Sequence, residues 1–274
     1  MTTPRFYLGT HKPAWLWNPA ADFPLFVSRR ALSACRTLHP ATHAWALDSG
    51  GFTELSTFGT WRTRPTEYVE AVARYDREIG RLDWAAPQDW MCEPAIIHGG
   101  GPGGFPGTGL SVGEHQRRTV ANFLELGELW AAESDRPSPF VPVLQGWTMG
   151  DYADCADMYE AAGVRLAEQR VVGLGSVCRR QNTVRIGAIV GMFAGELPVH
   201  GFGVKTQGLA VYGAQLTSAD SLAWSLDARR SDPLPGHAHK SCSNCLEYAS
   251  QWRADLLDQV DTASARPDFE TKAA

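Results

Sequence analysis

Long apolar runs are missing from this sequence: no stretch approaches the roughly eighteen consecutive apolar residues that a membrane-spanning helix requires. The first residues, MTTPRFYLGTHK, lack the apolar core of a secretion signal, so we expect a cytoplasmic protein. An excess of positive charge is also missing, because the net charge is −5. This excludes a surface coated with cations, although a single cleft can still concentrate arginine and lysine for nucleic acid.

Closely spaced cysteines are scarce as well. Four of the six are scattered along the chain, at Cys35, Cys92, Cys155 and Cys178. Only Cys242 and Cys245 lie close together, which indicates a reduced chain with one metal site. A redox CxxC motif is the alternative, but no thioredoxin-like βαβ pattern surrounds this pair.

What the sequence does contain is a regular alternation of short apolar runs and helical patterns. The predicted strands are Arg5–Gly9, Pro24–Ser28, Trp45–Asp48, Leu82–Ala86, Phe140–Leu144, Val171–Leu174, Leu197–Phe202 and Ser218–Trp224. The predicted helices include Pro65–Ile79, Val112–Ala131, Tyr152–Ala162 and Arg185–Phe193. This order predicts an α/β fold, an irregular (β/α)8 TIM barrel over residues 1–230, because the link between the first two strands is too short for a good helix. A doubly wound open sheet is the alternative.

Polar side chains follow the ends of several predicted strands. WALDSGGF places Asp48 at such an end, APQDWMCEP places Asp89 after the next strand, and Gln145 and Asp220 follow later ones. Taken alone, each of these residues fits a turn or a helix cap. In a barrel, however, the carboxyl ends of the strands meet at one mouth, so we expect these side chains to share a cavity. Paired carboxylates in one pocket suit acid/base chemistry combined with nucleophilic attack at an acetal-like carbon.

The segment Ile96–Gly109, IIHGGGPGGFPGTG, is so rich in glycine that it predicts a flexible loop after the fourth strand. A lid or substrate clamp over the active-site face is one interpretation of this loop, and a plain connector is the other.

A second constellation lies near the C-terminus, in HAHKSCSNC. His237, His239, Cys242 and Cys245 offer two imidazoles and two thiolates, a full tetrahedral set for structural Zn²⁺. We therefore predict a zinc-binding subdomain over residues 231–260, packed on the barrel, and a disordered tail over 261–274.

The ordered motifs DSGGF at 48–52, QD at 88–89, LQG at 144–146, GLGS at 173–176, HGFGVK at 200–205 and ADS at 219–221 resemble those of tRNA-guanine transglycosylases. The chain is most similar to the shorter relatives in this superfamily, the DNA 7-deazaguanine transglycosylases of phages and bacterial genomic islands. The resemblance implies an enzyme that exchanges guanine in DNA for a free 7-deazaguanine, such as 7-cyano-7-deazaguanine (preQ0), without cutting the strand.

The resemblance also implies residue roles. Asp220 would be the nucleophile that forms a covalent glycosyl-enzyme intermediate at C1′, and Asp48 the general acid/base. The base would contact Ser49, Phe52, Asp89, Gln145, Gly175 and His200. Because the target nucleotide must flip out of the stack, phosphate contacts are expected near the mouth, from Arg179, Arg180 and Lys205. Ordinary solvated surface is the alternative for these three cations.

Some residues depart from the pattern of the tRNA enzymes: Thr53 replaces a glutamine, His200 replaces an apolar residue, and the metal set begins with histidines. These changes favour DNA over tRNA. The alternatives are a tRNA-guanine transglycosylase, a nucleoside or base hydrolase of the same superfamily, and a noncatalytic nucleic-acid-binding subunit. We also expect a possible helper ATPase or helicase, a possible homodimer and no membrane partner. The expected location is the cytoplasm of a bacterial or phage-infected cell.

Overall fold

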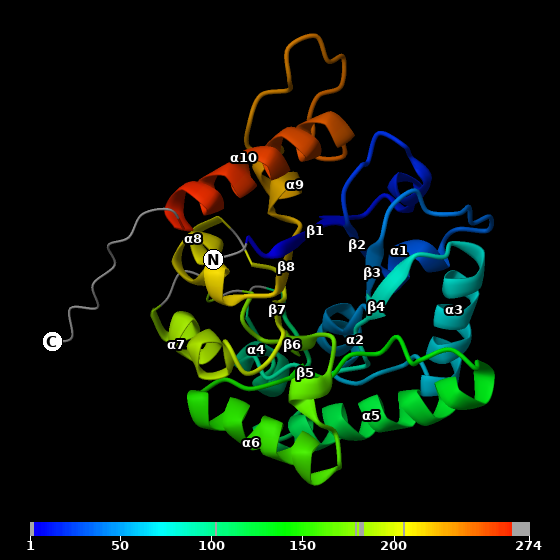
Figure 1. Cartoon of the computed structure of the whole chain (residues 1–274), viewed down its shortest axis with the longest axis vertical. Coiled ribbons are helices and arrows are strands. Elements are labelled where there is room, and N and C mark those ends of the chain that lie inside the picture. The colour runs from blue at the N-terminus through cyan, green and yellow to red at the C-terminus, as the bar shows by residue number, and fades with distance from the viewer. Residues whose placement is uncertain (1–2, 102, 179, 181–183, 205, 265–274) are drawn as a thin grey trace, which may run out of the picture.

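The computed structural model describes residues 3–101, 103–178, 180, 184–204 and 206–264. Eight short strands lie at the centre of the molecule, with helices around them (Figure 1). The strands are β1 (Arg5–Thr10), β2 (Leu25–Ser28), β3 (Trp45–Asp48), β4 (Leu82–Ala85), β5 (Val143–Leu144), β6 (Val172–Leu174), β7 (Val199–Gly201) and β8 (Ser218–Ser221). They form one sheet in the order β4-β3-β2-β1-β8-β7-β6-β5, and every pair within it is parallel.

The two outer strands of this order are joined through the backbone just before β5. The Ala85 N–H donates to the carbonyl of Pro139 at 2.9 Å, and the Val141 N–H donates to the carbonyl of Ala85 at 3.2 Å. These bonds connect β4 to the chain that leads into β5, so the parallel sheet curls into a ring. The prediction of an α/β fold of the (β/α)8 type is confirmed.

The helices follow the strands in chain order, as a barrel requires. They are α1 (Arg29–Ser33), α2 (Gly51–Phe58), α3 (Pro65–Glu78), α4 (Pro94–His98), α5 (Val112–Glu133), α6 (Met149–Ala161), α7 (Val184–Phe193), α8 (Thr206–Tyr212), α9 (Ala223–Asp227) and α10 (Leu246–Ser264). Between β1 and β2 there is only a short 3-10 helix, η1 (Pro13–Trp17), which confirms the irregularity expected there. Two further 3-10 helices are η2 (Leu166–Glu168) and η3 (Gly213–Gln215).

Alternation along the strands divides the core into two layers. On β1, Phe6 and Leu8 belong to the large cluster between the sheet and the helices, whereas Tyr7 belongs to a smaller cluster inside the ring. The inner cluster also contains Phe26 and Trp84. Successive side chains of a strand point to opposite faces, and both faces of this sheet are covered, which is why most of the strands are rich in apolar residues, with β8 (SADS) the exception.

Its glycine content led us to expect that the segment 96–109 does not pack, and the described residues of this segment contradict that expectation. Ile96 and Ile97 lie in α4 and are buried. Gly100 and Phe105 form an antiparallel bridge, and Phe105 packs against a small cluster around Trp90. Many glycines here have positive φ, which lets the backbone turn tightly enough to make these contacts.

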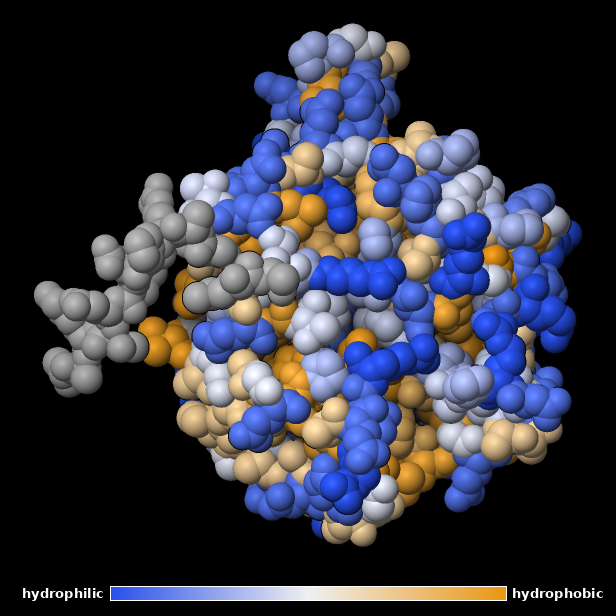
Figure 2. Space-filling view, viewed as in Figure 1, coloured by the Kyte–Doolittle hydropathy of each residue, from blue (hydrophilic) through white to orange (hydrophobic). Residues whose placement is uncertain are grey.

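The C-terminal helix α10 packs onto the barrel through Ala249, Leu256 and Val260, which belong to the main core, while Trp252 contacts Phe6 of β1. The helix continues to Ser264, past the boundary predicted for the tail, and residues 265–274 lie outside the described part of the chain. The segment between α9 and α10 stands out from the body as a lobe with a largely hydrophilic surface (Figure 2). A separate zinc-binding subdomain over 231–260 stays a prediction. None of the described helices is both long and apolar enough to span a membrane.

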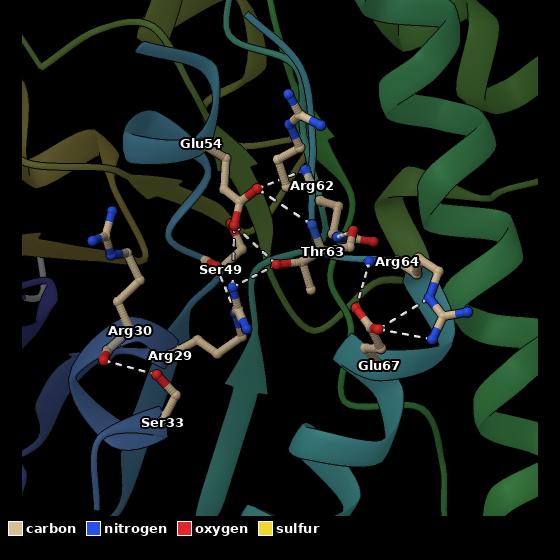
Figure 3. A network of polar contacts seen from close by, with 10 residues as sticks. Arg29, Arg30, Ser33, Ser49, Glu54, Arg62, Thr63, Arg64 and Glu67 are labelled. Atoms are coloured by element: carbon tan, nitrogen blue, oxygen red, sulfur yellow. Dashed lines mark hydrogen bonds and ion pairs between the residues drawn. The ribbon is translucent and has the colours of Figure 1, made fainter. Parts of the chain in front are cut away.

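A buried ionic network fixes the turn that follows β3 (Figure 3). Glu54 of α2 accepts hydrogen bonds from the backbone N–H of Arg62 at 2.7 Å and from the Thr63 hydroxyl at 2.9 Å. Arg29, which follows β2, donates to Thr63 Oγ1 at 2.7 Å and lies 3.3 Å from Glu54 Oε1. The network ties α2 to the ends of two strands and to the loop before α3.

Replacing the carboxylate in this network, Glu54→Gln, should lower the free energy of unfolding by about 1–3 kcal/mol, because Arg29 loses its charged partner in a poorly hydrated place. Urea unfolding followed by circular dichroism measures the change. Glu78→Gln is the matched control, since Glu78 pairs with Arg74 on the surface of α3 and should cost much less. Equal losses in the two variants would contradict a stabilising role of the buried network.

Candidate active site

A cavity of about 280 Å³ lies at the carboxyl ends of the strands. Six residues predicted for the site line it: Asp48, Phe52, Asp89, Gln145, Gly175 and Asp220. They come from five different strand ends or the loops that follow, and a parallel ring brings all of these to one mouth. The joint occurrence of polar residues at successive strand ends therefore corresponds to one pocket.

Asp48 ends β3, directly beside Ser28 of β2 in the register of the sheet. Its carboxylate accepts hydrogen bonds from the Ser28 side chain and from the Gly50 N–H, so it does cap the turn while it faces the cavity. Gly50 has φ of 81°, a conformation that a residue with a side chain rarely adopts. Burial is the largest effect on this carboxyl and raises its pKa, and the negative charge of Asp220 raises it further.

Asp220 lies in β8, on the other side of β1 from Asp48, and is 6% exposed. Its Oδ1 accepts a hydrogen bond from the Gly203 N–H at 2.9 Å and lies 3.3 Å from Nε2 of His200. Two carboxyl groups thus face one cavity in different surroundings. Paired carboxyl groups in different surroundings can take different roles in acid/base chemistry.

Asp89 and Gln145 form a hydrogen-bonded pair in the cavity wall. Gln145 Nε2 donates to Asp89 Oδ2 at 2.5 Å, and Gln145 Oε1 lies 2.7 Å from the hydroxyl of Ser176. That hydroxyl also accepts from the Cys92 N–H at 2.8 Å, so the amide orientation of Gln145 is determined by its neighbours. Gly175 has no side chain because a Cβ there would lie 2.2 Å from Gln145 Nε2.

Burial raises the pKa of Asp89 from 3.8 to about 7. The hydrogen bond from Gln145 opposes the rise, and the negative charges of Asp48 and Glu93 add to it. A carboxyl with this pKa changes its ionisation in the neutral range, where it can serve both as donor and as acceptor.

Phe52 is 37% exposed at the edge of the cavity, in the first turn of α2. Its ring makes an edge-to-face contact with Phe105, with centroids 5.8 Å apart. The glycine-rich segment therefore reaches the cavity mouth and supports the aromatic ring that faces it.

Two residues predicted for the base site do not line this cavity. Ser49 is buried, and its backbone carbonyl lies in the network around Arg29 (Figure 3). His200 is fully buried beneath Asp220, among the aromatic rings inside the barrel. Strand alternation places a residue inside the barrel, but it does not tell at which depth.

Of the predicted phosphate contacts, only Arg180 lies among the described residues; Arg179 and Lys205 lie outside them. Arg180 donates to the carbonyl of Trp147 at 2.7 Å, and its guanidinium lies 4.0 Å from the centre of that ring. It stands after β6 at the same end of the barrel as the cavity, although it is not part of the wall.

Sequence reasoning missed several residues of the wall, among them Glu93, Ser176, Cys178 and Phe202. Glu93 Oε2 lies 2.9 Å from the Ser176 hydroxyl, whose single proton it shares with Gln145 Oε1. Ser176 has φ of 56°, an uncommon value for a residue with a side chain. The signal for both was present in the motifs DWMCEP and GLGS, whose later residues extend the polar ends of β4 and β6.

The predicted metal ligands form a compact cluster in the lobe between α9 and α10. Four ligand atoms, one each from His237, His239, Cys242 and Cys245, lie within 4.8 Å of one another. His237 Nδ1 is 3.2 Å from His239 Nε2 and 3.7 Å from each of the two sulfurs. The other ring nitrogen of His237 lies 3.1 Å from Glu247 Oε2, an arrangement that orients imidazole ligands in metal sites. These four side chains could hold a metal ion.

Comparison with known families now places the protein. The family model of DpdA, DeoxyPurine in DNA protein A, matches residues 2–273. The chain belongs to this family. The match confirms the resemblance predicted from the motifs, and it associates the protein with DNA modification by a transglycosylase-like chain.

Other comparisons add less. No curated protein matches the sequence. Among solved structures, the chain is similar to a protein of Coccidioides immitis described as a fructose-1,6-biphosphate aldolase, with 13% identity and a TM-score of 0.46. The similarity covers 96% of this chain and 93% of that one.

The raised pKa of Asp89 predicts a pH-dependent stability. Between about pH 4 and 7 the folded protein holds a proton on Asp89 that the unfolded chain has lost. The contribution of this residue to the free energy of unfolding is therefore complete below pH 4, and it declines as the pH rises to 7. Compared with Asp89→Asn, the wild type should lose up to about 4 kcal/mol of unfolding free energy over this interval, at about 1.4 kcal/mol per pKa unit. Urea unfolding at a series of pH values tests this, and parallel curves for the two proteins would refute it.

Proposed function

We propose that this protein exchanges guanine in DNA for a free 7-deazaguanine, with 7-cyano-7-deazaguanine the favoured base, through a covalent aspartyl-glycosyl intermediate. The observation that carries the proposal is the convergence of Asp48 and Asp220 on one cavity whose wall contains the Asp89–Gln145 pair. Membership in a family named for a deoxypurine in DNA supports DNA as the substrate.

In the first step, Asp220 attacks C1′ of a flipped deoxyguanosine. The new bond joins a carboxylate oxygen to C1′, the bond from C1′ to guanine N9 breaks, and its electron pair leaves with the base. Guanine is a poor leaving group as an anion, so Asp48 supplies a proton to the departing ring. The raised pKa of Asp48 supports this role, because it keeps a larger fraction of the carboxyl protonated.

In the second step, the incoming 7-deazaguanine loses its N9 proton to the carboxylate of Asp48. Its N9 attacks C1′, the ester bond to Asp220 breaks, and the electron pair of that bond returns to the Asp220 carboxylate. The two steps leave both residues in their starting states and conserve the energy of the glycosidic bond.

Recognition of the base is assigned to the Asp89–Gln145 pair. Guanine and the 7-deazaguanines share an N1–H and a 2-amino group, which are donors suited to a carboxylate. Phe52 offers an aromatic ring at the edge of the cavity, on which a flipped base can stack. Because the pKa of Asp89 is about 7, its acceptor form becomes dominant above neutral pH.

For the metal cluster we propose a structural Zn²⁺. Bond lengths of about 2.3 Å to sulfur and 2.0 Å to nitrogen place neighbouring ligand atoms of a tetrahedral site about 3.3–3.8 Å apart, close to the separations found around His237. In residues 229–245, all of which the structure describes, Cys242 is the one buried residue. A lobe with so small an apolar core needs a crosslink to hold its shape, and four protein ligands leave no position for substrate.

An exchange assay tests the proposed reaction. Duplex DNA, single-stranded DNA and tRNA, each labelled in guanine, are incubated with the protein and 7-cyano-7-deazaguanine, and released label and denaturation-stable protein–DNA adduct are measured. We expect label release and adduct with DNA. Asp220→Asn should abolish the adduct and lower exchange by roughly 10³-fold or more, and Asp48→Asn should lower exchange by about 10²–10⁴-fold.

Asp83→Asn is the matched control, because Asp83 belongs to β4 but contacts Tyr7 and Arg5 rather than the cavity. Its exchange rate should equal that of the wild type. Release from tRNA alone would refute the DNA substrate, and release without the added base would indicate a hydrolase. Normal exchange by Asp220→Asn would refute the nucleophile, and binding of nucleic acid without release would indicate a noncatalytic subunit.

The zinc proposal predicts that Cys242→Ser lowers the zinc content measured by metal analysis of the purified protein. Cys35→Ser is the control, since Cys35 lies far from the cluster in sequence and contacts the carbonyl of Ala31. We also expect the Cys242 variant to be cut by protease within residues 229–245 earlier than the control. Unchanged zinc content in Cys242→Ser would be incompatible with this site.

A further inference from the structure

His200 is a polar residue in the apolar interior of the barrel, and the reaction proposed above gives it no role. It lies in β7, directly opposite Ser218 of β8, and is fully buried. The rings of Trp84 and Phe202 surround it, with centroids 4.7 and 4.8 Å away. An imidazole in such surroundings is costly unless both of its nitrogens are hydrogen-bonded.

Both nitrogens of His200 do have partners. Nε2 lies 3.3 Å from Asp220 Oδ1, and Nδ1 lies 2.9 Å from the hydroxyl of Ser218. An ionised carboxylate can only accept hydrogen bonds, so Nε2 carries the proton. In the neutral imidazole, Nδ1 is then the acceptor, and the Ser218 hydroxyl donates to it.

The same oxygen of Asp220 also accepts the Gly203 N–H at 2.9 Å. Both of these hydrogen bonds therefore end on Oδ1. Two donors on one oxygen fix the rotation of the carboxylate about its last torsion. No hydrogen bond from the described residues ends on Oδ2, which is the oxygen left for attack.

We propose that His200 is a positioning residue for Asp220: with its tautomer and ring orientation set by Ser218, it holds Oδ1 so that Oδ2 faces the reacting carbon. This inference rests on the proposed function of Asp220 as the nucleophile. It replaces the expectation that His200 contacts the base, since a side chain beneath the cavity floor acts through the aspartate.

The arrangement serves both steps of the exchange. In the attack, fixed orientation matters because a displacement of about 1 Å can cost a factor of roughly 100 in rate. In the covalent intermediate, Oδ1 becomes the carbonyl oxygen of the ester. When the ester breaks, negative charge returns to this carboxylate, and donors already in place around Oδ1 stabilise it without reorganisation.

Three variants separate positioning from packing. His200→Leu fills the space but removes the donor, His200→Gln retains an N–H near the position of Nε2, and Ser218→Ala removes the group that fixes the tautomer. Tyr7→Phe is the matched packing control. Tyr7 contacts the His200 ring with centroids 6.0 Å apart, and its hydroxyl bonds to Asp83 and to the Trp84 indole, so the variant disturbs the surroundings of His200 without touching its hydrogen bonds.

Single-turnover adduct formation with saturating DNA gives the rate, and the equilibrium dissociation constant of 7-cyano-7-deazaguanine gives base binding. We expect His200→Leu to form adduct roughly 10- to 100-fold more slowly with unchanged base affinity. His200→Gln should recover most of the rate, Ser218→Ala should fall between them, and Tyr7→Phe should match the wild type. Equal rates in His200→Leu and the wild type, or equal losses in the Leu and Gln variants, would overturn the proposal.

A second measurement is independent of activity. Nitrogen NMR shifts of the His200 imidazole in the free protein should show the tautomer protonated at Nε2, and Ser218→Ala should disturb this tautomer. A ring protonated at Nδ1 would overturn the inference even if exchange occurs. A protein that forms no adduct but shows the expected tautomer would refute the proposed function and leave the hydrogen-bond chain to Asp220 established.

Discussion

Two backbone hydrogen bonds between Ala85 and the chain at residues 139 and 141 join β4 to the segment before β5, and with them the parallel ladder becomes a ring. In a parallel ring every strand ends at the same mouth. Asp48 and Asp220 are far apart in the sequence, yet β3 and β8 deliver them to one cavity. The candidate site is therefore a consequence of strand direction, and the loops that follow the strands complete it.

Gathering carboxyl groups in one cavity has an electrostatic cost, which the structure offsets residue by residue. Asp48 receives donors from Ser28 and Gly50, Asp89 receives the amide of Gln145, and Asp220 receives Gly203 and His200. These donors do not offset the cost of burial equally for the three carboxyl groups. Burial still raises the pKa of Asp48, and it brings that of Asp89 to about 7. Carboxyl groups that differ in this way can divide the work of holding a proton, binding a base and attacking a carbon.

Most of the fold and part of the site were predictable from the sequence. A polar residue recurs after successive predicted strands, and this pattern predicted that Asp48, Asp89, Gln145 and Asp220 share a cavity. The four candidate metal ligands were close enough in the sequence to be recognised as a set.

Two features were not predictable, for physical reasons. Glycine content indicated a loose segment at 96–109, but two buried isoleucines and a bridge between Gly100 and Phe105 determine its structure. The position of His200 depends on how deeply β7 sits in the barrel relative to β8, a property of the closed ring that no local pattern contains. The sequence showed that the polar His200 belongs to a predicted strand, but it did not show which neighbours would form hydrogen bonds with it.

The pairing of the first and last strands joins segments that lie far apart in the chain. The Arg5 N–H donates to the carbonyl of Thr217, and the Trp224 indole donates to the carbonyl of Gly9 at 2.8 Å, across 215 positions of the chain. β2 covers one edge of β1 and follows it directly in the sequence, but β8, the partner of the other edge, comes after every other strand. Closing so long a loop is slow, because its entropic cost precedes any gain from contacts. The edge of β1 that faces β8 therefore stays unpaired until the ring closes, and the floor beneath Asp220 forms with that closure.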